Sequence, residues 1–243
     1  MTAAAPAQAP LAFIEVPLGR VRRTTLGGLP APGAEIEGPF SLDVAAHTTV
    51  SVVGDEASGV DTLGGLALGL ERAPAGQVMT LGTEIAKLAR MAQLAFRRKV
   101  GYLPAGDGLM QNLTLRENIR LPLRFGSNFR PKDIEGRVDV IVAQLRLTHV
   151  ADLRPAQTNA EERRRAALGR ALAFDPELVV LEEPFDGLTD RAAGELLEAA
   201  RGGETAAGSR RTVLITGASL PALLRHRVDH AHRLVRGRLD KGH

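Results

Sequence analysis

Two short apolar runs constrain the fold of this chain most strongly. They are ELVVLEE at residues 177–183 and RTVLITG at residues 211–217. Continuous apolar runs of this length are typical of strands that are buried on both faces of a parallel sheet. Other strand-like segments precede them and alternate with segments of helical periodicity. This alternation predicts an α/β fold with a mostly parallel sheet that helices cover on both faces.

The other elements follow from periodicity and from turn residues. We expect further strands at residues 11–16, 40–44, 48–53, 76–82 and 99–104. We expect helices at residues 61–72, 86–99, 113–123, 131–147, 159–174 and 191–202. Thr114 and Glu117 have the spacing of a capping box, and Asn159 stands at the N-cap of the helix that it begins.

The segment VVGDEASGVDTL, residues 52–63, has the outline of a phosphate-binding loop. Gly54 and Gly59 are spaced as in G-x-x-x-x-G-K-[ST], between a strand-like run and a helix-like run. Val60 stands in place of the lysine, and Asp61 in place of the serine or threonine. Losing the lysine alone weakens phosphate binding by about ten- to more than a hundredfold. The segment is either a simple strand-to-helix turn or a loop in which a metal ion shields Asp61, with Thr62 supplying a hydroxyl one position late.

Composition narrows the classes of function. The 243 residues contain no cysteine, which excludes disulfides and thiolate metal sites, and only 3% are aromatic, which disfavours base-stacking platforms. A net charge of +3 does not require a nucleic-acid or anionic-lipid partner. We find no signal peptide and no apolar stretch of about 18 residues, so we expect a cytoplasmic protein.

One longer stretch carries a family resemblance. RRRAALGRALAFDPELVVLEEPFDGL, residues 163–188, resembles the passage from the signature motif through Walker B in the nucleotide-binding subunits of ATP-binding cassette (ABC) transporters. With the loop at 52–63 and the segment KVGYLPAGDGLMQNLTLRENIRLPL, the resemblance covers roughly residues 12–238. It implies a P-loop NTPase-like (ABC ATPase) core with an antiparallel β subdomain and an inserted helical subdomain.

The resemblance also implies a domain organisation. We expect a disordered tail at residues 1–11 and one ABC-type nucleotide-binding domain at residues 12–243. The helical subdomain would span about residues 106–174 and would contact the permease. Members of the family dimerise head to tail and hold two ATP molecules between the subunits.

The Walker B position holds the pair Glu182–Glu183. Glu183 matches the catalytic glutamate that the family uses to orient water. Glu182 has one methylene more than the aspartate that holds Mg²⁺ in the family, which would displace the ion. Carboxylates at the end of a parallel strand lie where α/β proteins place their sites. We therefore keep two interpretations, a vestigial site and a solvated strand end.

The remaining motif positions are also substituted. The signature motif LSGGQ aligns with TNAEE, residues 158–162, in which Asn159 still caps the helix but Ala160 and Glu161 replace the two glycines. The family's Q-loop glutamine aligns with Ala105 and its switch histidine with Gly217. Neither residue can orient a γ-phosphate or relay a proton. Because both halves of the composite site are changed, pairing with an active subunit would repair neither.

These substitutions predict a catalytically degenerate ABC transporter ATP-binding-type subunit, a pseudo-ATPase with a structural or regulatory role on a membrane permease. We expect no metal site and at most weak binding of ATP and Mg²⁺. The partners implied are the permease and a second nucleotide-binding subunit, in a homodimer or a heterodimer, on the inner face of the cell membrane. The segment LTLRENIRLPLRF looks most like members that serve lipid-handling or lipoprotein-release permeases.

Two alternatives have their own motivation. A slow, unconventional Mg-ATPase would use Asp61 and Glu182 to hold Mg²⁺ and Glu183 to position water. A nucleic-acid-binding protein would use the basic segments at residues 163–165 and 225–238, although acidic neighbours offset these charges. We expect no nucleic-acid partner.

Overall fold

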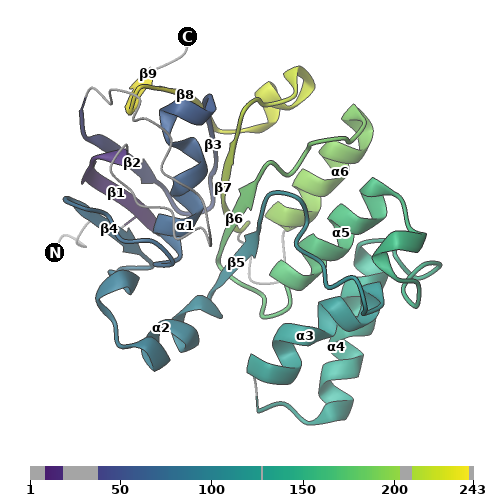
Figure 1. The fold of residues 1–243 in the computed structure, drawn as a ribbon. Coiled ribbons are helices and arrows are strands. Elements are labelled where there is room, and N and C mark those ends of the chain that lie inside the picture. Colours follow the sequence, from purple (N-terminus) through teal and green to yellow (C-terminus); the bar gives the residue numbers. More distant parts are fainter. Residues whose placement is uncertain (1–8, 19–37, 127, 203–209, 241–243) are drawn as a thin grey trace, which may run out of the picture.

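A computed structural model describes residues 9–18, 38–126, 128–202 and 210–240 (Figure 1). Most of the segment that we expected to be a tail, residues 1–8, lies outside the described residues. The first strand, β1, begins at Leu11, whose side chain is fully buried. The expected tail therefore extends one residue too far, because the apolar residues that anchor β1 in the core start at Leu11.

The central sheet contains six strands in the order β5-β6-β7-β3-β8-β9. They are β3 (Thr49–Val53), β5 (Val100–Leu103), β6 (Leu178–Glu182), β7 (Thr212–Gly217), β8 (His230–Val235) and β9 (Arg238–Asp240). All neighbouring strands pair in parallel except β8 and β9, which are antiparallel. The predicted mostly parallel sheet is confirmed. The carboxyl ends of β3, β6 and β7 lie side by side, which is where ligands bind in such sheets.

A smaller antiparallel sheet lies beside the central one. It contains β1 (Leu11–Val16), β2 (Phe40–Val44) and β4 (Gln77–Thr80) in the order β2-β1-β4. Phe13 and Phe40 pack edge to face inside it, with their ring centroids 5.2 Å apart. This sheet is the antiparallel β layer that the family resemblance implies.

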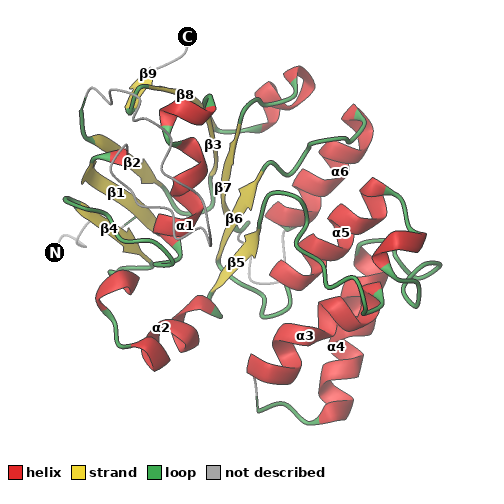
Figure 2. Cartoon of the chain, in the orientation of Figure 1, coloured by secondary structure: helices red, strands yellow, loops and turns green. Residues whose placement is uncertain are grey.

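Helices cover both faces of the central sheet (Figure 2). They are α1 (Leu63–Ala67), α2 (Arg90–Arg97), α3 (Leu115–Gly126), α4 (Pro131–Gln144), α5 (Ala160–Ala171) and α6 (Asp190–Arg201). The smaller sheet and α1 lie on one side, and α5 and α6 lie on the other (Figure 1). Helices α3 and α4 pack together and α3 also contacts α5.

Two helices are shorter than predicted. The helix expected at 61–72 is the end of one 3-10 turn, Val60–Thr62, followed by α1, which stops before Gly69 takes a left-handed φ of 60°. The helix expected at 86–99 is a 3-10 turn and then α2, because Leu88 and Ala89 are extended. In both segments part of the predicted helix forms, but the backbone leaves the helical conformation at Gly69 in the first and at Leu88 and Ala89 in the second.

The core consists of two apolar clusters that the central sheet separates. Side chains of β6 alternate between them, with Val179 and Leu181 in one cluster and Leu178 and Val180 in the other. The first cluster includes residues of α3–α6, and the second includes α1 and the smaller sheet. This two-sided burial explains why the strand at 177–183 is apolar at consecutive positions.

The C-terminal basic segment forms part of the central sheet, and most of its basic side chains are exposed. Residues 225–238, which motivated the nucleic-acid alternative, contain the end of a 3-10 turn at Ala222–Arg227, then β8 and the first residue of β9. Only Leu234 of β8 is fully buried, so its polar sequence gives little strand signal. Among the described residues, no helix combines the length and the apolar character needed to span a bilayer.

Candidate functional site

The predicted phosphate loop follows β3 and makes its polar contacts internally. The N–H of Gly54 donates to the carbonyl of Gly217 at 3.0 Å. The hydroxyl of Ser58 donates to the carbonyl of Asp55 at 2.6 Å and accepts from the N–H of Val60 at 3.2 Å. A β carbon on Gly54 would lie 2.3 Å from Ser58 Oγ, so only glycine fits there. The Val60 amide, which an anion would need in such a loop, is thus already used.

The residue at the lysine position belongs to the apolar core. Val60 is 4% exposed and clusters with Leu18. Gly59 has a φ of 83°, and a β carbon there would lie 2.9 Å from Leu18 Cβ, so Leu18 packs directly against the loop. The Thr62 hydroxyl donates to the Gly59 carbonyl at 2.7 Å, while Asp61 is exposed. The loop therefore presents a carboxylate outward and an apolar side chain inward.

Glu182, at the end of β6, is held by the neighbouring strand and by α1. Its Oε2 accepts a hydrogen bond from the hydroxyl of Tyr102 at 2.7 Å. A β carbon on Gly64 would lie 2.1 Å from Glu182 Oε1, so the longer side chain is accommodated opposite a glycine. The pKa of Tyr102 is raised, first by burial, then by the hydrogen bond to Glu182 and by the negative charges of Glu182 and Glu71.

We expect Tyr102→Phe to lower the free energy of unfolding by about 1–3 kcal/mol at neutral pH, because Glu182 loses a charged hydrogen bond. The pKa of Tyr102 is raised in the folded state above its ordinary value near 10. Above about pH 10 the Tyr102 hydroxyl therefore keeps its proton in the folded chain but loses it in the unfolded chain. The stabilisation that Tyr102 provides is therefore complete below that pH and declines above it. Urea unfolding of both proteins should show their stability difference narrowing as the pH rises past about 10. A stability difference between the two proteins that stays constant across that pH range would contradict the hydrogen bond from Tyr102 to Glu182.

Glu183 folds back onto the end of β7. It has a left-handed φ of 45°, and its N–H donates to the Thr216 carbonyl at 2.8 Å. Its Oε1 accepts from the N–H of Ala218 at 2.8 Å. A β carbon on Gly217 would lie 2.9 Å from Glu183 Oε2. The carboxylate thus fills the space in which a side chain at the switch-histidine position would begin.

Ala105 lies exposed in the turn that follows β5. The next three residues, Gly106, Asp107 and Gly108, all have positive φ. Arg170 of α5 donates to the carbonyls of Gly108 at 2.7 Å and Asp107 at 3.0 Å. The turn is therefore attached to α5 through its backbone, without any side chain at position 105 that could reach a phosphate.

Arg164 of α5, one of the three arginines at 163–165 that motivated the nucleic-acid alternative, is a buried cation. It is 7% exposed, and within the described part of the chain its Nη1 has no hydrogen-bond partner. Burial lowers its pKa, while the negative charges of Asp107, Asp186 and Glu183 oppose that effect. Carboxylates that follow β5 and β6 thus partly offset the positive charge of Arg164 in α5.

Asn159 caps α5 and does so with its own neighbours. Its Oδ1 accepts from the N–H of Glu162 at 2.9 Å, and the Glu162 carboxylate accepts from the Asn159 N–H at 2.9 Å. The predicted N-cap is confirmed as a full capping box. Glu161 pairs with Arg165 at 2.5 Å in the same helix. The helix start that would face a phosphate in the family is therefore occupied by carboxylates.

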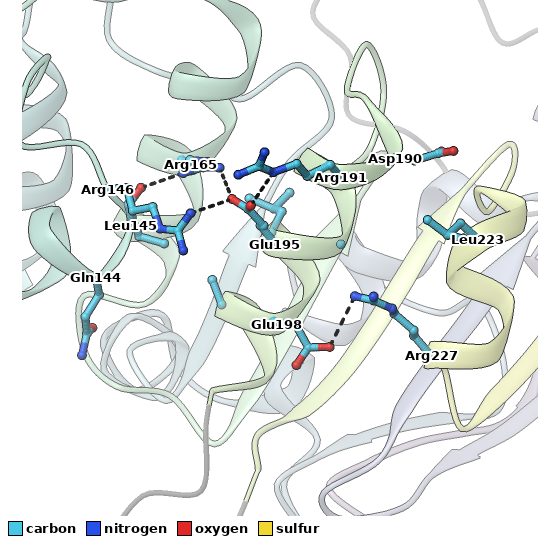
Figure 3. Close-up of a pocket in the computed structure, with 13 residues that line it drawn as sticks. Gln144, Leu145, Arg146, Arg165, Asp190, Arg191, Glu195, Glu198, Leu223 and Arg227 are labelled. Carbon is cyan, nitrogen blue, oxygen red and sulfur yellow. Dashed lines mark hydrogen bonds and ion pairs between the residues drawn. The ribbon is translucent and has the colours of Figure 1, made fainter.

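Two adjoining pockets lie away from these residues. The first, of about 410 Å³, is lined by α6, the end of α4 and residues of the 3-10 turn at Ala222–Arg227 (Figure 3). Glu195 lies there between Arg191, Arg165 and Arg146, and its pKa is lowered chiefly by the hydrogen bond from Arg191 (Figure 3). The second, of about 440 Å³, continues between α4 and α6. None of the predicted site residues lines either pocket.

The comparisons with known proteins agree with the fold and with the order of the motifs. Residues 38–186, more than half of the chain, match the family model described as ABC transporter. The chain belongs to the ABC transporter family. The lipoprotein-releasing system ATP-binding protein LolD of Chromohalobacter salexigens is 33% identical over 203 residues, which are 83% of this chain and 84% of that protein. This match confirms the resemblance to lipoprotein-release ATP-binding subunits.

Other proteins match over a shorter stretch of sequence or in fold alone. The sulfate/thiosulfate import ATP-binding protein CysA of Escherichia coli is 33% identical over 162 residues, which are 65% of this chain but only 42% of that protein. A solved dimeric ATP-binding cassette in a post-hydrolysis state, bound to ADP and Pi, has a TM-score of 0.78 at 19% identity and covers 95% of this chain and 96% of its own. At that identity the structural likeness shows the ABC ATPase fold alone.

The structure brings most of the predicted ABC motif positions together. Gly54, Glu183 and Gly217 are in contact at the carboxyl ends of β3, β6 and β7, and Glu182 contacts α1 beside them. Asn159 lies in the helical layer and is engaged within α5. Sequence reasoning missed three residues around the loop. Ser58 lies in the loop and accepts from Val60, Leu18 packs against Gly59, and Tyr102 donates to Glu182. Ser58 carried a signal, because a hydroxyl inside a phosphate-type loop has backbone groups within reach.

Proposed function

We propose that this ABC-family chain is a pseudo-ATPase, an ATP-binding-type subunit that serves a membrane permease structurally or as a regulator. The observation that carries the proposal is the burial of Val60 in the apolar core at the lysine position. Phosphoryl transfer depends on positioning and on neutralising the charge of the phosphates. A loop with a buried valine and an exposed aspartate can neither position the phosphates nor neutralise their charge.

The contacts of the two Walker B carboxylates support the same proposal. Glu182 is bound to Tyr102 and faces Gly64. Glu183 accepts from the backbone of Ala218. Both carboxylates therefore have internal partners that stabilise the folded chain without Mg²⁺ or a nucleotide. The capping box at Asn159 places acidic groups at the other half of a composite site, where they repel a γ-phosphate.

We further propose that the permease contact lies at the turn before α3. Met110 in this turn is 49% exposed, and the segment that follows is the one whose sequence resembles the family's permease-contacting segment. Attachment to the permease would place the subunit at the inner face of the cell membrane. A second nucleotide-binding subunit, identical or homologous, would complete the dimer, as the dimeric form of the solved cassette suggests for the family.

ATP turnover and ATP binding test the proposal directly. Purified chain should release phosphate at the background rate, and Glu183→Gln should leave that rate unchanged. A fluorescent ATP analogue should bind at least about tenfold more weakly than to an ATP-hydrolysing ABC subunit measured alongside, because the lysine contact is missing. Turnover of a few per second that Glu183→Gln abolishes would overturn the proposal. Micromolar, Mg²⁺-dependent binding would instead support the slow Mg-ATPase.

A further inference from the structure

The two pockets described above form one groove along α6. Four residues line both of them: Gln144, Leu145, Glu198 and Ala199. The first pocket therefore continues into the second. On α6 the lining residues run from Asp190 to the C-cap Gly202, which is about 18 Å at the helical rise of about 1.5 Å per residue. We call the hollow that the two pockets make together the α6 groove.

The α6 groove has buried apolar residues in its lining and one exposed apolar side chain in each half. Leu145 and Leu196 line the first half and are buried, as is Ile141 in the second. Leu223 lines the first half and is 55% exposed, and Val140 lines the second and is 54% exposed. Concave surfaces that join apolar residues with a few polar groups are where proteins bind ligands and peptides. The groove therefore offers apolar surface that a bound segment can cover.

Arginines dominate the charge of the groove. Among the described residues that line it, six arginines stand against four carboxylates. Glu195 lies between three of these arginines, at 2.6 Å from Arg165, 3.0 Å from Arg191 and 3.4 Å from Arg146 (Figure 3). One carboxylate cannot accept from every N–H of three guanidinium groups. The side chains of Arg146 and Arg191 are 68% and 83% exposed, so N–H donors remain there for a ligand.

A glycine inside α6 leaves room for a further arginine of the groove. A β carbon on Gly194 would lie 3.0 Å from Arg227 Nη1, so the guanidinium of Arg227 lies against the helix at this point. Arg227 is held there at 4.0 Å from Glu198 (Figure 3). Apart from proline, glycine is the least favourable residue in a helix interior. At this position α6 therefore combines a poor helix former with the close approach of a cation to the groove.

We propose that the α6 groove binds a segment of a partner protein in which acidic and apolar side chains alternate. A guanidinium group binds a carboxylate through two parallel N–H donors, so Asp or Glu of the segment suits Arg146 and Arg191. Apolar side chains of the segment cover Leu223 and Val140. In an extended chain successive side chains point to opposite sides, and about six residues span the length of the groove.

The lining of the groove favours an acidic peptide over other anions. No aromatic side chain is present among the described residues that line it, so nucleotide bases have no stacking partner there. A small anion such as phosphate leaves Leu223 and Val140 exposed to water. The groove does not include the turn before α3, so the inference does not depend on the permease contact proposed above.

Fluorescence anisotropy with a labelled peptide tests this inference with the full chain. The probe is a fluorescein-labelled peptide of about eight residues in which glutamate and leucine alternate, which is long enough to span the groove. One control peptide has lysine in place of glutamate, and the other has glycine in place of leucine. We expect saturable binding of the probe with a Kd below about 1 mM, and binding of each control at least about tenfold weaker.

Charge-reversal variants locate the binding site. Arg146→Glu with Arg191→Glu should weaken binding of the probe at least about tenfold, because two charged hydrogen-bond donors are lost. Arg225→Glu with Arg233→Glu makes the same charge change on exposed residues outside the groove and should alter binding by less than about twofold. Circular dichroism checks that each variant is folded.

Gly194→Ala separates binding from folding. Alanine favours the helix, but its β carbon moves Arg227 away from the groove. We expect this variant to resist urea at least as well as the unchanged chain and to bind the probe severalfold more weakly. Failure of the probe to bind below about 1 mM would overturn the inference, as would equal losses in the two charge-reversal variants. Self-association of the chain that Arg146→Glu with Arg191→Glu abolishes would assign the groove to a second copy and would also overturn it.

Discussion

Replacing Asn118 with leucine is expected to lower the free energy of unfolding by about 3–5 kcal/mol. Asn118 is fully buried in α3, and its Oδ1 accepts from the N–H of Met110 at 2.8 Å. Its Nδ2 donates to the carbonyls of Met110 at 3.1 Å and Thr114 at 2.9 Å. Leucine fills a similar volume but leaves the Met110 N–H unpaired, which costs about 1–3 kcal/mol. The Met110 and Thr114 carbonyls still accept from the N–H groups of Leu113 and residue 118, so each loses one hydrogen bond, worth about 0.5–1.5 kcal/mol.

Urea unfolding measures this effect, and Asn112→Leu is the matched control. Asn112 is exposed in the same segment, so its replacement should change the stability by no more than about 0.5 kcal/mol. The Asn118 variant should also be cleaved faster near Met110 by a protease, because the turn before α3 loses its internal support. Equal stability of the two variants would show that Asn118 does not organise this turn.

Asp229→Ala is the second substitution for which we expect a large effect, about 2–4 kcal/mol of destabilisation. The carboxylate of Asp229 accepts from the N–H of Thr49 at 2.7 Å and lies 3.6 Å from Arg201, which is almost fully buried. Arg201 also donates to the Thr49 hydroxyl at 2.7 Å. Alanine leaves a buried N–H unpaired and removes a counter-charge from a buried guanidinium.

An exposed ion pair provides the control for Asp229. Asp133 pairs with Arg130, whose side chain is 84% exposed, so Asp133→Ala should cost less than about 1 kcal/mol. Thermal unfolding of both variants gives the comparison. Since Asp229 precedes β8 and pairs with the first residue of β3, its loss should loosen the β3–β8 pairing first, visible as faster amide hydrogen exchange in β8. Equal exchange rates in the two variants would contradict this account.

The sequence predicted elements best where burial leaves a strong pattern. The strands at 177–183 and 211–217 are buried on both faces, so their central positions are apolar in succession and the prediction is confirmed. Strand β8 was missed because only Leu234 is fully buried, and a strand with one buried residue has no period that can be recognised. The helix starts at Thr114 and Asn159 were found because capping depends on residues three positions apart.

The candidate site was predictable in its positions but not in its contacts. Motif spacing identified Val60, Glu182 and Glu183, because the family places these residues at the ends of particular strands. It did not indicate that Tyr102 binds Glu182, since those residues are 80 positions apart and meet only through the pairing of β5 with β6. Nor did it indicate that Leu18 packs on Gly59.

What the sequence determined by itself is the family, the alternation of strands and helices, and the identity of the side chains missing from the nucleotide motifs. These depend on local periodicity and on residue type at fixed spacing. Only the tertiary structure decided that Val60 joins the core, that Glu183 fills the space beside Gly217, and that Met91 and Leu94 of α2 are exposed. The physical reason is that burial and partner choice depend on residues far away in the chain, which strand register and helix packing alone bring together.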